Sequence, residues 1–391
     1  MCSGLFLYSE TVIKQQRPIC SRRWFWVKQE YMRRAIELAK LGIGKVNPNP
    51  LVGAVIVKDG RIIGEGYHAR YGDLHAERHA FSRLTEEAKD AEMYVTLEPC
   101  CHYGKQPPCT QAIIEHGIKR VYVGSDDPNA LVAGKGIQTL RKAGIEVETQ
   151  VLKEECDALN PVFFHFISTK TPFVVIKYAM TMDGKIACDT GKSQWITGKE
   201  ARSHVQETRN ALMGIMVGIQ TIITDNPRLT CRIPGGRNPI RIICDSHLRI
   251  PMAAEVVQTA KKTPTIVATV SSEQEKICAL QKAGVKVIIT DSTDGKVDLR
   301  DLMQKLGQEK IDSILLEGGG TLNQNALQSG IVNHMQIYLA PKIFGGTGKY
   351  TPVSGTGVRE PDEAYLLTNR KMRTFGDDIL LEYDVAKRRA E

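Results

Sequence analysis

The sequence predicts an α/β protein of two domains. Its 391 residues exceed what one ordinary hydrophobic core holds, and 42% hydrophobic with 25% charged residues is typical of a globular protein. Val- and Ile-rich runs alternate with stretches of helical spacing, and this alternation pauses only near residues 156–172. We therefore expect one α/β domain on each side of that pause.

The first series of elements begins with a helix around Met32–Ala39, which Gly42 is expected to end. Two strands joined at Asp59-Gly60 follow, because this dipeptide is a strong hairpin signal. The remaining pattern predicts a helix from about His75 to Lys89 and then, in turn, a strand at 91–97, a helix at 110–117, a strand at 120–125, a helix at 136–144 and a strand at 145–150.

The second series is dominated by Val and Ile, which favours a sheet buried on both faces. Its expected strands lie within residues 173–180, 211–218, 240–245, 265–270, 285–290, 313–320 and 334–346. The run "LLEGGGTLN" predicts a strand, a glycine-rich turn and a helix start, where backbone N–H groups could hold a cofactor phosphate. Its spacing is not that of a Rossmann dinucleotide site.

Charge and cysteine usage exclude several classes of protein. The net charge is +8, but residues 1–40 hold eight Lys/Arg and three Glu, so the rest carries only +3 and no basic stripe typical of nucleic-acid binding. No apolar run is long enough for a membrane span. The ten cysteines form no disulfide framework, which favours a reducing, cytoplasmic location. The basic start lacks a secretory signal, so we expect a disordered extension or a misplaced start codon, with an organellar transit peptide as the alternative.

Two short stretches indicate a catalytic zinc site. "HAE" at His75–Glu77 is followed by "EPCC" and a further cysteine at Cys109. One His and two Cys as zinc ligands leave one coordination position open for water, and zinc lowers the pKa of a water bound there. A nearby carboxylate can then transfer the proton that this water releases. Cys100, directly after Pro99, is expected at a helix N-terminus, where a thiolate is favoured.

The spacing differs from the short deaminase signature H-x-E with P-C-x-x-C. Eight residues separate Cys100 from Cys109, and Cys101 and His102 are rival ligands. A structural zinc closed by a fourth ligand, in a binding or regulatory module, therefore remains the alternative to a catalytic ion.

These stretches resemble the deaminase half of the bifunctional riboflavin-biosynthesis deaminase/reductase family. The resemblance lies in "NPNPLVGAVIVKDGRIIGEGYHARYGDLHAE" and "YVTLEPCCHYGKQPPCT". It implies a cytidine-deaminase-like three-layer domain, with Glu77 as the proton shuttle and zinc held by His75, Cys100 and Cys109. It implies substrate contacts at Asn49, His68, Asp127 and Asn129. Arg78 departs from the family pattern, which is usually apolar there.

The resemblance continues through "KYAMTMDGKIACDTGKSQWITG", "VGIQTIITDNPRLTCR" and "SILLEGGGTLNQNAL" into a reductase domain with a dihydrofolate-reductase-like fold. It implies NADPH contacts at Ala179, Trp195, Thr221, Asp225, Ser246, Gly318, Gly319, Gly320 and Thr321. It implies substrate contacts at Ser193, Arg209, Leu229, Arg232 and Glu317. The guanidinium groups of Arg209 and Arg232 suit a ribose phosphate. The alternative is that these two arginines are ordinary surface residues and that Trp195 fills the core.

The resemblance implies two consecutive reactions. Zinc-dependent deamination of 2,5-diamino-6-(5-phosphoribosylamino)pyrimidin-4(3H)-one would precede NADPH-dependent reduction of its ribosyl chain to 5-amino-6-(5-phosphoribitylamino)uracil. We expect an extension over residues 1–25, a deaminase domain over 26–168 and a reductase domain over 169–391. The expected partner is this small molecule, without nucleic acid or membrane, in a homo-oligomer.

Two alternative enzymes remain. A tRNA adenosine deaminase shares the HAE and PC motifs, but it would need an RNA-binding surface and leaves the second domain unexplained. A monofunctional enzyme would result if one domain had lost its activity, although the motifs of both are present.

Overall fold

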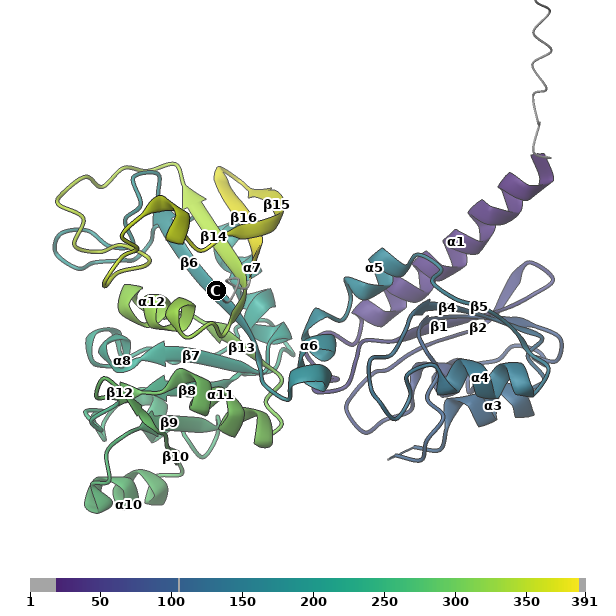
Figure 1. Cartoon of the computed structure of the whole chain (residues 1–391), viewed down its shortest axis with the longest axis horizontal. Helices are drawn as coiled ribbons and strands as arrows, with labels where there is room; N and C mark the ends of the chain where they lie inside the picture. Colours follow the sequence, from purple (N-terminus) through teal and green to yellow (C-terminus); the bar gives the residue numbers. More distant parts are fainter. Residues whose placement is uncertain (1–18, 105, 387–391) are drawn as a thin grey trace, which may run out of the picture.

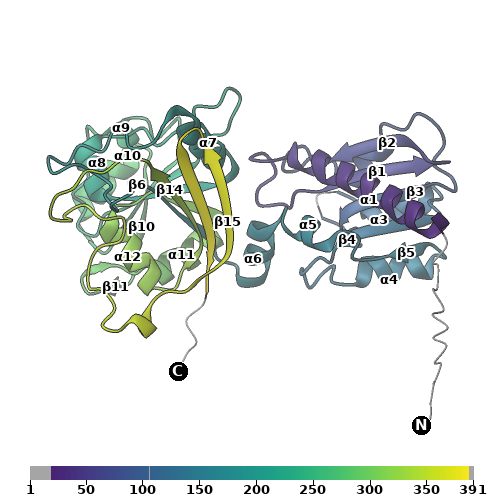
Figure 2. The ribbon, with the colours of Figure 1, turned by 90° about the horizontal axis from the view of Figure 1, so that it is seen from above.

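A computed structural model describes residues 19–104 and 106–386, with side chains from residue 28 onward. The chain forms two α/β bodies joined by helix α6 (Pro161–Thr169), which lies between them (Figures 1 and 2). Residues 1–18 of the expected extension lie outside the described residues, whereas residues 19–25 belong to helix α1. No helix within the described ranges is long and apolar enough to cross a membrane.

The N-terminal domain is a five-stranded sheet between two layers of helices. The strand order is β2-β1-β3-β4-β5, with the β2-β1-β3 pairs antiparallel and the β3-β4-β5 pairs parallel. The strands are β1 (Gly53–Lys58), β2 (Arg61–Tyr67), β3 (Glu92–Leu97), β4 (Arg120–Ser125) and β5 (Glu146–Glu148). The helices are α1 (Ile19–Lys40), α2 (Ala76–Phe81), α3 (Cys109–Glu115), α4 (Lys135–Lys142) and α5 (Lys153–Asp157).

Alternation along the strands separates two hydrophobic clusters. Val55 and Val57 of β1 pack in the cluster that contains residues of α1, while Ala54 and Ile56 pack in the cluster that contains residues of α2, α3 and α4. The predicted hairpin is confirmed, since Lys58 pairs with Arg61 across the turn and Asp59 has a positive φ of 49°. This is the three-layer architecture that the sequence predicted.

The helix predicted from His75 to Lys89 is wrong in its length. Helix α2 ends at Phe81, and the chain then turns back toward the sheet. The backbone N–H and the hydroxyl of Thr85 both donate to the Ile63 carbonyl of β2, at 2.9 and 3.2 Å. Tertiary hydrogen bonds at the sheet therefore outweigh the local helical pattern.

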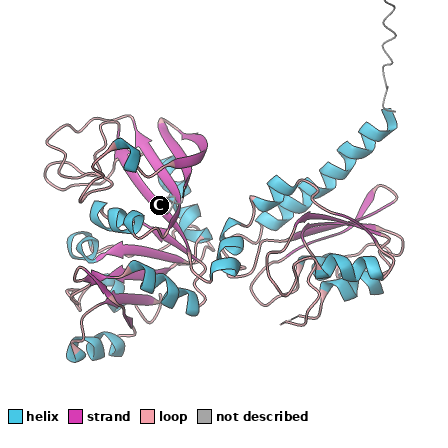
Figure 3. Ribbon diagram, viewed as in Figure 1, coloured by secondary structure: helices cyan, strands magenta, loops and turns pink. Residues whose placement is uncertain are grey.

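The C-terminal domain is a nine-stranded sheet in the order β10-β9-β8-β7-β13-β6-β14-β16-β15. Figure 3 shows helices packed around the strands of this domain. Its first seven strands are parallel: β6 (Phe173–Thr181), β7 (Gly214–Gly218), β8 (Ile240–Cys244), β9 (Thr265–Thr269), β10 (Lys286–Ile289), β13 (Ser313–Leu316) and β14 (Val332–Ala340). The smaller sheet pairs β11 (Ser292–Thr293) with β12 (Lys296–Val297).

Helices cover both faces of this large sheet, as predicted from its Val- and Ile-rich strands. Two separate buried clusters lie on its opposite faces, so Met216 and Ile215 of β7 belong to different clusters. The helices are α7 (Lys199–Ala211), α8 (Ile219–Asp225), α9 (Glu255–Gln258), α10 (Gln274–Lys282), α11 (Leu299–Gln308), α12 (Gly320–Gln328) and the 3₁₀ turn η1 (Pro361–Glu363).

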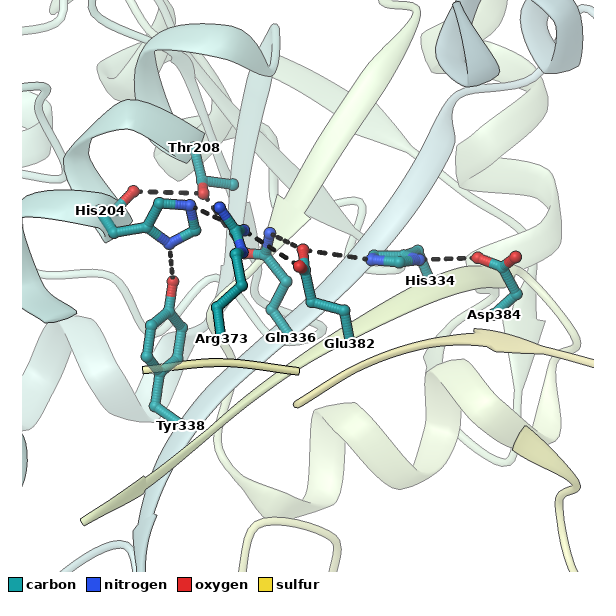
Figure 4. Close-up of polar contacts among 8 residues, drawn as sticks. All are labelled: His204, Thr208, His334, Gln336, Tyr338, Arg373, Glu382 and Asp384. Carbon is teal, nitrogen blue, oxygen red and sulfur yellow. Dashed lines mark hydrogen bonds and ion pairs between the residues drawn. The ribbon is translucent and has the colours of Figure 1, made fainter. Parts of the chain in front are cut away.

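A C-terminal hairpin, β15 (Leu367–Phe375) and β16 (Asp378–Val385), completes the sheet in antiparallel orientation. The sequence analysis did not identify it, because β15 is polar and exposed along almost its whole length. A chain of polar contacts fixes the hairpin to β14 and α7 (Figure 4). It consists of His204, Thr208, His334, Gln336, Tyr338, Arg373, Glu382 and Asp384.

Candidate active sites

The three potential metal ligands of the N-terminal domain converge. His75 Nδ1 lies 3.5 Å from Cys100 Sγ and 3.4 Å from Cys109 Sγ. Zinc bonds of about 2.0 Å to nitrogen and 2.3 Å to sulfur separate tetrahedral ligands by roughly 3.5 Å, so these atoms fit one zinc ion. Among the described residues no fourth His, Cys, Asp or Glu joins this group. The donor set is therefore that of a catalytic site with one position left for a reactant.

Local structure explains why these residues meet. His75 is the extended residue before α2, and Cys109 is the first residue of α3. The expectation that Cys100 begins a helix is wrong, because Pro107 and Pro108 are tolerated only at or before a first turn and α3 begins after them. The N–H of Cys109 nevertheless donates to Cys100 Sγ at 3.4 Å. The side chain of Cys109 is the main cause of the lowered pKa of the Cys100 thiol, and His75 and this N–H lower it further.

Glu77 lies beside the three ligands and is 4% exposed. It lines a pocket of about 330 Å³ together with His75 and Cys100. Burial raises the pKa of the Glu77 carboxyl above its ordinary value. A buried carboxyl next to a metal-bound reactant can accept a proton and release it again, which is the task of a general acid–base group.

The four predicted substrate contacts of this domain line the same pocket. Asn49 Nδ2 lies 3.1 Å from His68 Nε2, and the other ring nitrogen of His68 lies 3.0 Å from the Leu74 carbonyl. The Asp127 carboxylate accepts the N–H of Asn129 at 2.8 Å. Burial raises the pKa of Asp127 to about 6. Polar groups from three separate loops thus surround the space beside Glu77.

The rival ligands lie away from the metal group. The Cys101 thiol faces the Leu131 carbonyl at 3.8 Å, and His102 lines the pocket. His102 Nδ1 is buried and makes no hydrogen bond within the described residues, so a bound molecule could use it. Arg78 turns from Glu77 and donates to the carbonyls of Pro107 and Pro108 at 3.1 and 3.0 Å.

A second pocket, of about 910 Å³, lies in the C-terminal domain. Arg209 and Glu317 form a two-pronged ion pair there, with N···O distances of 3.1 and 2.6 Å and side chains only 12% exposed. Burial alone would raise the pKa of Glu317, but Arg209 and Lys177 lower it to about 2. Burial lowers the pKa of Lys177. Buried charges of both signs therefore line one wall.

The predicted cofactor residues follow the carboxyl edges of three neighbouring parallel strands. Thr221 and Asp225 belong to α8 after β7, Ser246 follows β8, and the glycine turn follows β13. A Cβ added to Gly319, directly before α12, would meet no atom within 4 Å, whereas one on Gly320 would clash with Ser354 Oγ. The backbone at Gly319 therefore adjoins open space before a nine-residue helix, a position that fits a nucleotide phosphate. Of the predicted set, Ala179, Trp195 and Gly318 also line the large pocket.

The structure distinguishes between the alternative roles expected for the predicted residues of this domain. Trp195 is 56% exposed, with the Arg202 guanidinium 4.5 Å from its ring centre, so it does not fill the core. Ser193 and Arg232 line the pocket, as do Arg209 and Glu317. Leu229 is 5% exposed and packs into a core cluster, so its side chain is not part of the pocket wall.

Several wall residues were missed by sequence reasoning. Glu98, in the run before Cys100, accepts the N–H groups of Gly134 and Ile137 at 2.9 and 3.2 Å. Its place within "EPC" was an available signal. Aromatic and aliphatic side chains of the linking helix also line the smaller pocket, and only tertiary structure brings them there: Phe163, Phe166 and Ile167.

Family models match both domains. A model described as the cytidine and deoxycytidylate deaminase zinc-binding region matches residues 27–125, and one described as the RibD C-terminal domain matches residues 172–381. The riboflavin biosynthesis protein RibD of Actinobacillus pleuropneumoniae is 54% identical over 91% of this chain and 95% of its own length. The RibD protein of Escherichia coli is 37% identical over 90% of this chain and 97% of its own length.

Solved structures agree with these matches. Acinetobacter baumannii RibD superposes with a TM-score of 0.83 at 35% identity, over 93% of this chain and 100% of that one. A deaminase/reductase from Thermotoga maritima, at 38% identity, gives a TM-score of 0.81 over 93% of this chain and 100% of its own. The chain therefore belongs to the RibD family of bifunctional deaminase/reductases of riboflavin biosynthesis, which use Zn²⁺ and NADPH.

Proposed function

We propose that each domain performs one of two consecutive reactions on the same pyrimidine nucleotide. Residues 26–168 deaminate 2,5-diamino-6-(5-phosphoribosylamino)pyrimidin-4(3H)-one. Residues 169–391 reduce the ribosyl chain of the product to give 5-amino-6-(5-phosphoribitylamino)uracil. The observation that carries the first assignment is the buried carboxylate of Glu77 beside three convergent potential zinc ligands in one pocket.

In the deaminase pocket, His75, Cys100 and Cys109 would hold a zinc ion, which would supply an activated water at neutral pH. The Glu77 carboxylate would accept the proton that is released and pass it to the ring nitrogen. A carbon–oxygen bond forms at C2, the bond to the amino group breaks, and Glu77 delivers the second proton to the departing ammonia. Asn49 and His68 orient the pyrimidine.

Asp127 and Asn129 hold the sugar or phosphate end of the nucleotide in the same pocket. The Asp127 carboxylate organises this loop by accepting the Asn129 N–H, and the Asn129 side-chain oxygen accepts the Leu131 N–H at 3.2 Å.

In the reductase pocket, residues at the carboxyl ends of β13, β7 and β8 and on β6 would hold NADPH, which would supply a hydride to C1 of the ribosyl group. The residues that we propose as its contacts are Ala179, Trp195, Thr221, Asp225, Ser246, Gly318, Gly319, Gly320 and Thr321. Arg209, Arg232 and Ser193 bind the phosphorylated chain, and Glu317 orients Arg209. We assign to Lys177 the donation of the proton that the opening sugar oxygen requires, because its side chain lines this pocket next to Arg209 and Glu317. Leu229 supports this wall from the core.

The substrate is a small molecule, and we propose a cytoplasmic homo-oligomer as the working form. The test is mass spectrometry of the diaminopyrimidine after incubation with zinc-loaded protein, with and without NADPH. We expect a deaminated product without NADPH and a deaminated, reduced product with it. An unchanged substrate in both samples, with folded and zinc-loaded protein, would contradict the assignment.

A further inference from the structure

The loop over residues 41–50 bridges the two domains. Asn47 Nδ2 donates to Asp312 Oδ2 at 2.7 Å, and Arg237 Nη2 lies 3.5 Å from Asn47 Oδ1. These partners stand 265 and 190 positions further along the chain, in the C-terminal domain. One amide side chain therefore pairs with a carboxylate and a guanidinium of the other domain.

The C-terminal side of this junction is rigid. Asp312 is 1% exposed, and Ser313 Oγ donates to its other carboxylate oxygen at 2.6 Å. The loop also sits tightly against the end of α7, because a Cβ on Gly44 would lie 2.5 Å from the Asn210 carbonyl oxygen. Gly44 has a φ of +76°, so both its space and its backbone suit glycine. The bridge is thus held in a fixed register.

The other end of the loop forms the wall of the deaminase pocket. Asn49, two residues after Asn47, places its amide against His68 and donates its own N–H to the Val46 carbonyl at 2.9 Å. Asn160 then pins the next turn through both the N–H and the carbonyl of Leu51, at 2.8 and 2.9 Å. Pro48, Asn49 and Pro50 all line the pocket. The segment is therefore anchored by Asn160 on one side and by the junction on the other.

A substitution at this junction should affect the reductase pocket less than the deaminase pocket. Asp312 precedes the first residue of β13, whereas Glu317 follows the last. The strand between them is buried at every position and pairs in parallel with β6 and β7. Loss of one side-chain bond at its amino end leaves the opposite end supported by the sheet.

We propose that Asn47 and Asp312 are positioning residues for deamination, through which the reductase domain holds Asn49 in its substrate-binding place. This inference rests on the proposed function, in which the smaller pocket binds the diaminopyrimidine. Neither residue lines the smaller pocket, so we expect their loss to affect substrate binding more than the chemical step.

The experiment compares full-length, zinc-loaded variants in separate deaminase and reductase assays. Asn47→Ala should raise the deaminase KM about five- to tenfold, the effect of one lost hydrogen bond, with kcat within twofold. Asn47→Asp should raise KM further, since two carboxylates then face each other. The exchange Asn47→Asp with Asp312→Asn restores one donor and one acceptor, so it should return KM to within threefold of the parent.

The matched control is Asn369→Gly. It removes an amide-to-carboxylate bond of 2.8 Å inside the reductase domain, and glycine accepts the φ of 53° at that position. Its deaminase KM should equal that of the parent. An unchanged KM in Asn47→Ala, or an exchange variant that fails to recover, overturns the inference. If the parent itself does not deaminate the substrate, the proposed function fails instead.

Discussion

The two pockets of this chain are built on different physical principles. The deaminase pocket is small, about 330 Å³, and brings soft metal ligands and a buried carboxylate together within a few ångströms. The reductase pocket is larger, about 910 Å³, and lies along charged side chains and a glycine turn. Hydrolysis needs a proton carrier that the protein itself must place, whereas hydride transfer uses a reactive atom that arrives with the cofactor. The activity of the first pocket therefore depends on the exact position of a few side-chain atoms, whereas that of the second depends on a larger surface that binds cofactor and substrate.

The sharpest test of this contrast is Glu77→Gln. The amide keeps the size of the side chain but cannot move protons, so we expect ammonia release to fall about 10³-fold or more. Zinc content, measured by atomic absorption, should stay the same. Reduction of supplied deaminated substrate should also be unchanged, and an equal loss in both assays would refute the division of labour between the domains.

The reductase pocket should respond strongly to loss of a buried charge. Arg209→Met leaves Glu317 without its two-pronged partner, so we expect unfolding of that domain to become easier by about 3 kcal/mol. The reductase kcat/KM should fall about 10²-fold, because a phosphate contact is lost as well. Arg209→Lys keeps the charge but not the paired geometry and should lie between. Denaturant unfolding and NADPH oxidation measure the two effects, and a fully active Arg209→Met would contradict the assignment.

Arg78 tests how precisely the metal ligands must be held. Its guanidinium donates to two carbonyls directly before Cys109, so it fixes the loop that delivers this ligand. We expect Arg78→Val to weaken zinc binding about tenfold, the lower range for groups that support metal ligands. Competition with a chromogenic chelator measures this affinity.

The control for Arg78 is Arg83→Val, a change at an exposed position just beyond α2. It removes the same charge without touching the loop before Cys109. If both variants bind zinc equally, the net charge rather than the two carbonyl bonds sets the affinity.

The sequence predicted the deaminase site better than the reductase site, and the reason is physical. Two short stretches of sequence contain the candidate residues of the deaminase pocket, which are His75, Glu77, Cys100 and Cys109. Because each stretch is local, the combination of a metal-binding pattern and a carboxylate can be recognised directly in the sequence. The length of α2 was not predictable, since Thr85 is drawn to β2 by contacts that no local pattern reveals.

The reductase site is assembled from distant segments. Its predicted contacts came from resemblance, and the backbone explains most of them by placing the ends of β7, β8 and β13 at one edge. The side chain of Leu229 packs in the core, because burial of an apolar side chain is favourable. The exposed strand β15 lacks the apolar alternation that predicts strands. The bond between Asn47 and Asp312 spans 265 positions and leaves no local trace.

The smallest expected difference between the domains is in how their stability depends on pH. Burial disfavours the charged form of His334, but hydrogen bonds to Glu382 and Asp384 outweigh it and raise the pKa above 6.5. Burial would raise the pKa of Glu382, yet bonds from His334 and the nearby Arg373 lower it to about 2. These groups belong to the network of Figure 4, which holds the C-terminal hairpin on β14.

The sign of each contribution follows from these shifts. The raised pKa of His334 stabilises the fold fully below pH 6.5, and this contribution is lost as the pH rises through the folded-state value. The lowered pKa of Glu382 stabilises it above pH 4.5, and that contribution is lost as the pH falls toward 2. The reductase domain should therefore be most stable between these limits. His334→Gln should cost about 1 kcal/mol at pH 6 and less at pH 8, measured by urea unfolding of the full chain followed by reductase activity. An equal cost at both pH values would show that His334 contributes packing rather than charge.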